Sequence, residues 1–69
     1  MKVKDFVMLE CSGAMFDAID ASLPGCFAFP HLLISADKNV LAQQYGDYDV
    51  VHFEPKTKRT IKIYIKPSI

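Results

Sequence analysis

Cysteine and histidine, the side chains that bind soft metal ions, are few in this chain and far apart in the sequence. They are Cys11, Cys26, His31 and His52. Structural zinc sites usually take their ligands from close pairs such as Cys-x-x-Cys, and here each ligand would come from a different segment. We therefore predict no metal site and no cofactor. Both cysteines are interpreted as reduced, small and buried, because a secreted domain of this size usually carries a denser set.

Carboxylates are the next candidates, since paired acids can perform acid–base chemistry or bind hard cations. Asp47 and Asp49 share one face of an extended segment, and Asp17 and Asp20 lie elsewhere. Acids at the start of a strand are more often solvated or block edge pairing, and a calcium loop would need more oxygen ligands and its glycine. No serine or cysteine lies in a glycine elbow, and no phosphate loop is present. Because so small a domain also has little room for a pocket, we predict no catalytic residues and a non-enzymatic protein.

The most suggestive chemistry is a cluster of bases near the C-terminus. From Pro55 to the end there are five bases and no acid, although the net charge of the chain is zero. Such a surface suits an anionic partner, either a nucleic-acid backbone with a tyrosine stacked on a base or an acidic face of a protein. The alternative is that lysines keep an exposed strand soluble. The candidate partner-binding residues are Lys56, Lys58, Arg59, Lys62, Tyr64 and Lys66.

A β-hairpin over residues 47–66 would position these bases. Its second arm alternates, so that isoleucines lie on one face while Thr60, Lys62, Tyr64 and Lys66 lie on the solvated one. The two arms are separated by residues 55–59, for which we expect a loop longer than a tight turn. The residues predicted to be buried are Val51, Phe53, Ile61, Ile63 and Ile65.

The N-terminal segments leave two alternatives open. Val3, Phe6, Val7 and Cys11 recur at helical spacing, which predicts a helix within residues 2–11, but the apolar run from Phe6 to Leu9 also fits a buried strand. Residues 13–22 fit either a helix capped by Ser12 or a strand. The two choices are coupled, because an opening helix suits a following strand and an opening strand suits a following helix.

The middle of the chain predicts one more strand and one more helix. After the turn at residues 23–25 comes an apolar stretch, Cys26 to Ile34, in which Pro30 requires an edge strand or a break. Residues 38–44 fit a short helix with Asp37 as its N-cap, Val40 and Leu41 inward, and Gly46 at its end. The expected fold is α+β, with a small three- to four-stranded antiparallel sheet, the C-terminal hairpin, and one or two short helices packed on one face of a single domain, residues 1–69.

The amino-acid composition allows predictions of the oligomeric state and the cellular location of this protein. Residues classed as hydrophobic make up 51% of 69 positions, more than so small an interior can bury. We therefore expect apolar surface on the segment Phe27 to Ile34 and a homodimer that covers it. The longest uncharged run, residues 21–36, is too short and too interrupted to cross a bilayer, and the N-terminus lacks the apolar region of a signal peptide. These features indicate a cytoplasmic protein without a membrane partner.

Four stretches, Met1 to Leu9, Phe16 to Ala21, Tyr45 to Pro55 and Thr60 to Ile65, resemble small uncharacterised proteins encoded by bacteriophages and prophages. The resemblance covers about half of the chain and implies that the opening segment is a helix. It also implies a role in binding host or defence macromolecules, as an inhibitor or adaptor. Because the net charge is zero and the sequence pI is about 6.7, we favour a host protein as the partner, contacted through the acidic surface or Phe27-Ala-Phe-Pro-His, over nucleic acid.

Overall fold

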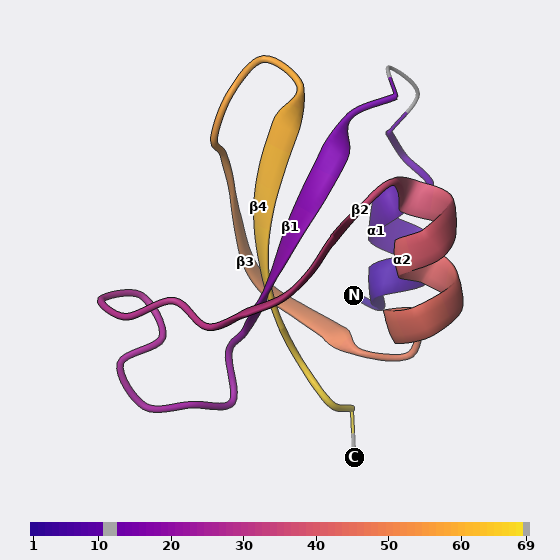
Figure 1. Cartoon of the computed structure of the whole chain (residues 1–69). Helices are drawn as coiled ribbons and strands as arrows, with labels where there is room; N and C mark the ends of the chain where they lie inside the picture. The colour runs from indigo at the N-terminus through magenta and orange to yellow at the C-terminus, as the bar shows by residue number, and fades with distance from the viewer. Residues whose placement is uncertain (11–12, 69) are drawn as a thin grey trace.

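The computed structural model describes residues 1–10 and 13–68. They form a four-stranded sheet with two helices on one face (Figure 1). We term the face that carries the helices the front face and the opposite one the back face. The elements in chain order are α1 (Val3–Val7), β1 (Met15–Asp20), β2 (Leu32–Ala36), α2 (Lys38–Tyr45), β3 (Asp49–Pro55) and β4 (Thr60–Lys66). The predicted α+β fold, with its C-terminal hairpin and short helices, is confirmed.

The strand order is β2-β1-β4-β3, so β2 and β3 form the edges of the sheet. The two outer pairs, β1 with β2 and β3 with β4, are antiparallel, as predicted. The central pair, β1 with β4, is parallel, and Ala18 lies opposite Ile63. A parallel pair needs a long crossover, and here the crossover is β2, α2 and β3 together. The sheet is therefore mixed, although mostly antiparallel.

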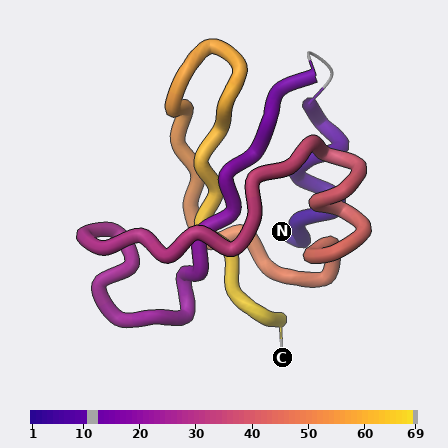
Figure 2. The backbone as a smooth tube through the Cα atoms, viewed as in Figure 1, coloured from indigo at the N-terminus to yellow at the C-terminus, as the bar shows by residue number. Residues whose placement is uncertain are grey.

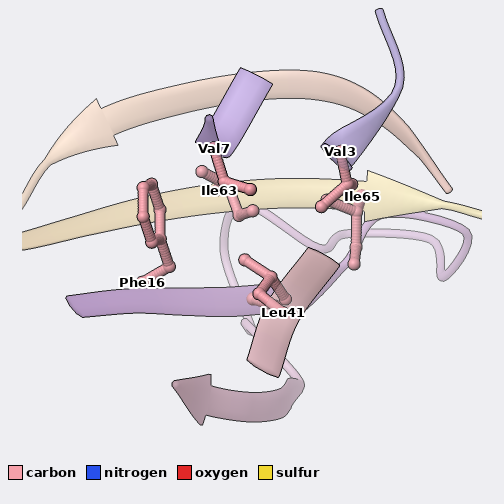
Figure 3. Close-up of a cluster of buried hydrophobic side chains, with 7 residues drawn as sticks. Val3, Val7, Phe16, Leu41, Ile63 and Ile65 are labelled. Atoms are coloured by element: carbon pink, nitrogen blue, oxygen red, sulfur yellow. The ribbon is translucent and has the colours of Figure 1, made fainter. Parts of the chain in front are cut away.

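The main core lies between the two helices and the front face (Figure 3). Val3 and Val7 of α1 and Leu41 of α2 are fully buried against the sheet. On the sheet side, Ile63 and Ile65 are fully buried too, because alternation along β4 places both on the front face. The burial predicted for these two isoleucines is confirmed, and Ile61 is half-buried at the margin of the same cluster.

The burial predicted for Val51 and Phe53 is wrong. They are 49% and 54% exposed, respectively. β3 is an edge strand, and its register against β4 shifts between Val50 and His52, so that Val50 rather than Val51 lies opposite the buried Ile65. A register shift of this kind changes which side chains meet the core.

The opening segment is a helix and residues 15–20 are a strand. Of the two alternatives for the N-terminal segments, the structure therefore has the one that the resemblance implied. Lys2, the N-cap of α1, makes no side-chain capping bond. The amides of Val3 and Lys4 instead donate to the carbonyls of Tyr48 and Gly46, at 2.8 and 3.1 Å. The loop between α2 and β3 therefore supplies the acceptors that a helix N-terminus needs. Two residues considered above, Ser12 as a cap and Cys11 as a buried thiol, lie outside the described residues.

The strand predicted at residues 26–34 is wrong in its first part, since β2 is Leu32–Ala36. Residues 21–29 form turns instead, and the amides of Ala28 and Phe29 both donate to the carbonyl of Gly25. Figure 2 shows this segment extending from the sheet as a long loop. Pro30 precedes the strand, and β2 lies at an edge as that proline required.

The second helix follows the prediction closely. The Asp37 carboxylate accepts a hydrogen bond from the Val40 amide at 2.9 Å, which makes Asp37 the N-cap. Leu41 is fully buried and Val40 half-buried. In the described part of the chain, neither helix has the length and apolar character needed to span a membrane.

Candidate functional site

A row of polar side chains crosses the back face, one from each strand. Asp17 of β1 lies opposite Ser35 of β2 on one side and Lys62 of β4 on the other, and Lys62 lies opposite Glu54 of β3. The Ser35 hydroxyl donates to Asp17 at 2.7 Å, and the Lys62 ammonium lies 3.4 Å from the Glu54 carboxylate. Lys62 also acts electrostatically on Asp17, so polar contacts and charge interactions together link the row across all four strands.

Two of the candidate bases are neutralised by acids on this face. Lys56, from the hairpin loop, reaches Asp17 at 3.0 Å, and Lys62 pairs with Glu54. Asp17 is the most enclosed member, with a side chain only 14% exposed. Burial raises the pKa of Asp17, but the Ser35 hydroxyl and the Lys56 ammonium outweigh that effect and hold it below its ordinary value. The hydroxyl of Tyr64 and the Glu54 carboxylate together raise the pKa of Lys62.

Replacing Asp17 by asparagine should remove a pH-dependent part of the stability. Because the folded-state pKa of Asp17 lies below its ordinary 3.8, the carboxylate stabilises the fold above that pH. This contribution is lost as the pH falls through the folded-state pKa. The difference in unfolding free energy between the wild type and Asp17→Asn should therefore shrink as the pH falls from about 5 to 3, as measured by urea unfolding.

Two lysines of the hairpin loop provide the matched pair for this experiment. Lys56→Met removes the ion pair with Asp17 and should reproduce part of the lost pH dependence. Lys58→Met changes an exposed lysine for which the described residues show no ion pair, so the pH profile should stay unchanged. If the difference in unfolding free energy between the wild type and Asp17→Asn stayed constant with pH, the lowered pKa of Asp17 would be contradicted.

The expectation that Tyr64 lies on a solvated face is wrong. Its side chain is 2% exposed, because the loop between β1 and β2 folds over the back face at this point. The Phe27 ring lies 4.5 Å from the Tyr64 ring, and His52 approaches it from β3 at 5.6 Å. Cys26 is buried in the same cluster, which confirms its interpretation as a buried free thiol. In this structure Tyr64 is not accessible to a nucleobase.

The remaining candidate bases are Lys58, Arg59 and Lys66, which are exposed and make no ion pair with any described residue. Lys58 and Arg59 lie in the hairpin loop, whereas Lys66 is the last residue of β4. A seven-residue strand separates the two positions by about 20 Å at 3.3 Å per residue. The six residues that the sequence grouped together therefore do not form one continuous basic surface.

An apolar groove, which the sequence did not predict, runs along β3 and α1 on the front side of the molecule. The volume of this open groove is about 330 Å³. Its most exposed members are Leu9 at 73% and Met1 at 67%. The Phe6 ring lies 4.9 Å from Phe53 at its centre. One signal was available, because the run Phe6 to Leu9 holds more consecutive apolar residues than one face of a short helix can bury. The groove is lined by Met1, Phe6, Leu9, Val50, Val51, His52 and Phe53.

A second apolar surface lies on the long loop and the first residue of β2, residues 23–32, which together we term the Phe29 loop. Phe29 is 85% exposed, and Leu32 and Leu23 are 55% and 43% exposed. Phe27 is 59% exposed although one side of its ring rests on Tyr64. Its other aromatic neighbour is His52, at 5.5 Å. Of the exposed patch expected at residues 27–34, Phe27 and Phe29 are therefore exposed in the loop and Leu32 at the start of β2, whereas Leu33 and Ile34 are half-buried in β2.

The candidate metal ligands lie apart from one another in the described part of the chain. Within residues 1–10 and 13–68, no three side chains among His, Cys, Asp and Glu are placed to share a metal ion. Asp47 and Asp49 each pair with a lysine instead, Asp47 with Lys4 at 3.4 Å and Asp49 with Lys2 at 3.8 Å. No protein-family model, curated protein or solved structure matches this chain.

Proposed function

We propose that this chain is a small, non-enzymatic protein-binding module that contacts its partner through the Phe29 loop. The observation that carries the proposal is the Phe29 side chain, 85% exposed at the surface. Leaving a phenylalanine in water forgoes about 1.5–3 kcal/mol of burial, which a partner surface would recover. Aromatic residues are enriched at protein interfaces for this reason.

The loop is also supported from beneath, which favours binding. Phe27 lies against Tyr64 and His52, and Cys26 is buried beside them, so one part of the loop is anchored to the sheet while Phe29 is presented outward. An anchored loop loses less conformational freedom on binding than a free one. The Phe29 loop therefore presents a preformed contact surface to a partner.

Nucleic acid is the less favoured partner. The bases that would follow a phosphate backbone are partly neutralised, Lys56 by Asp17 and Lys62 by Glu54. The tyrosine that would stack on a base lies beneath Phe27. Binding driven by phosphates requires several uncompensated bases on one surface.

The class of partner follows from the resemblance to small phage and prophage proteins. We propose a host or defence protein in the bacterial cytoplasm, which the module would inhibit or connect to another component. This choice rests on the four resembling stretches, and the Phe29 loop lies outside all of them. The loop would then be the part of the chain that determines which protein is bound.

Phe29→Ala should abolish capture of a specific protein from bacterial lysate by the immobilised chain, because truncating a hot-spot residue of an interface costs about 2 kcal/mol or more, roughly a thirtyfold loss of affinity. The matched control is Met8→Ala, which changes a side chain that is 52% exposed outside the loop. It should leave capture unchanged. The captured protein is identified by mass spectrometry, and capture should survive nuclease treatment. Capture that nuclease removes, or that Phe29→Ala leaves intact, would contradict the proposal.

A further inference from the structure

β3 is an edge strand, and most of its outer backbone has no neighbouring strand within the part of the chain that the structure describes. Only the start of this edge is paired. Asp49 forms an isolated antiparallel bridge with Lys2, and the Val50 amide donates to the Met1 carbonyl at 2.9 Å. The first two residues of the chain thus pair with the start of this edge. From Val51 to Pro55 the strand has no neighbour on that side among the described residues.

We propose that the open edge of β3 pairs antiparallel with β3 of a second copy, around a two-fold axis at Phe53. Phe53 is the midpoint of the open stretch, residues 51–55. A two-fold axis there places Phe53 opposite Phe53, and Val51 opposite Pro55 of the other copy. Apolar side chains therefore meet apolar side chains on the front side, as an isologous interface requires.

Pairing of polar side chains on the back side favours the same register. With Phe53 on the axis, His52 of each copy lies opposite Glu54 of the other. Within one chain these two side chains are already neighbours, 3.7 Å apart. Moving the axis by one residue, to His52, would place histidine opposite histidine and Glu54 opposite Val50. The register centred on Phe53 is therefore the one in which both sides of the strand are complementary.

The buried area requires the groove as well as the strand edge. A stable interface buries about 800 Å² per copy, roughly a sixth of the 4522 Å² surface of this chain. Five residues of one strand cannot supply that area alone. The exposed Met1 and Leu9 lie beside the same edge and extend the contact, with Phe6 packed against Phe53. An exposed apolar edge strand is otherwise prone to aggregation, so its pairing would also protect it.

Sedimentation equilibrium tests the dimer directly. Between about 1 and 100 µM the chain should show twice its 7.8 kDa mass. Phe53→Lys should give a monomer, because the two-fold axis would bring two ammonium groups together. Phe29→Lys, an equally drastic change on the other apolar surface, should leave the dimer intact. A monomeric wild type at 100 µM, or a dimer broken by Phe29→Lys alone, would overturn the proposal whether or not the Phe29 loop binds a partner.

Cross-linking tests the register and does not require that Phe53→Lys folds. In a chain whose own cysteines are replaced by serine, Phe53→Cys places a thiol opposite itself across the axis. Mild oxidation should link these chains at least about tenfold faster than Val51→Cys chains, whose thiol would face Pro55. Equal rates at the two positions, or no cross-link at either, would refute pairing around Phe53.

Discussion

Replacing Ile63 by alanine should lower the free energy of unfolding by about 2–5 kcal/mol. Ile63 of β4 is fully buried at the centre of the front face, beneath the helices, and lies opposite Ala18 of β1 and Phe53 of β3. Its removal would leave a cavity that the neighbouring strands cannot close without losing their register. Because small domains have a total stability of only about 5–15 kcal/mol, the change should be visible as a large fall in the urea midpoint.

Met15→Ala is the matched control for this substitution. It removes a large apolar side chain from β1, the strand next to β4, but one that is 42% exposed. It should cost about 1 kcal/mol or less, since little of the side chain leaves a packed environment. Equal effects of the two substitutions would show that the front face does not form the core.

The relative placement of side chains along a strand could be read from the sequence because it follows from backbone geometry. Alternation placed Ile63 and Ile65 together, and both are buried. Asp37 was recognisable as an N-cap because its side chain bonds locally, three residues along the chain. Both features depend on near neighbours in the sequence.

Which faces and edges are covered depends on contacts between distant residues, and these could not be predicted in the same way. Tyr64 belongs to the solvated face of an isolated hairpin, yet a loop about forty residues earlier places Phe27 over it. Phe53 looked like a core residue because the strand order, which leaves β3 at an edge, cannot be deduced from periodicity. The apolar groove and the Phe29 loop both follow from these long-range arrangements. The sequence did identify the candidate bases. It could not show that Lys56 and Lys62 form ion pairs with acids, because these pairs exist only in the folded chain.

Gly46→Ala should destabilise the fold by about 2–3 kcal/mol or more, because the added methyl group has no room. Gly46 has an ordinary right-handed conformation, with φ at −58°, so the backbone itself would accept alanine. A β-carbon at this position would overlap the carbonyl oxygen of Ala42 and lie 3.2 Å from the β-carbon of Lys4. The glycine is therefore required mainly by the last turn of α2, whose Ala42 carbonyl it would meet, and secondarily by Lys4 of α1, which lies close to the same point.

Two measurements separate this steric effect from a general weakening of α2. Gln43→Ala, at an exposed position in the same helix, should change the unfolding free energy by no more than about 0.5 kcal/mol. The Lys4 amide donates to the Gly46 carbonyl, so displacement of α1 in Gly46→Ala should also accelerate hydrogen exchange at Lys4. If Gly46→Ala unfolds at the wild-type urea concentration and the Lys4 amide stays protected, Gly46 is not enclosed by Ala42 and Lys4 as closely as the structure places it.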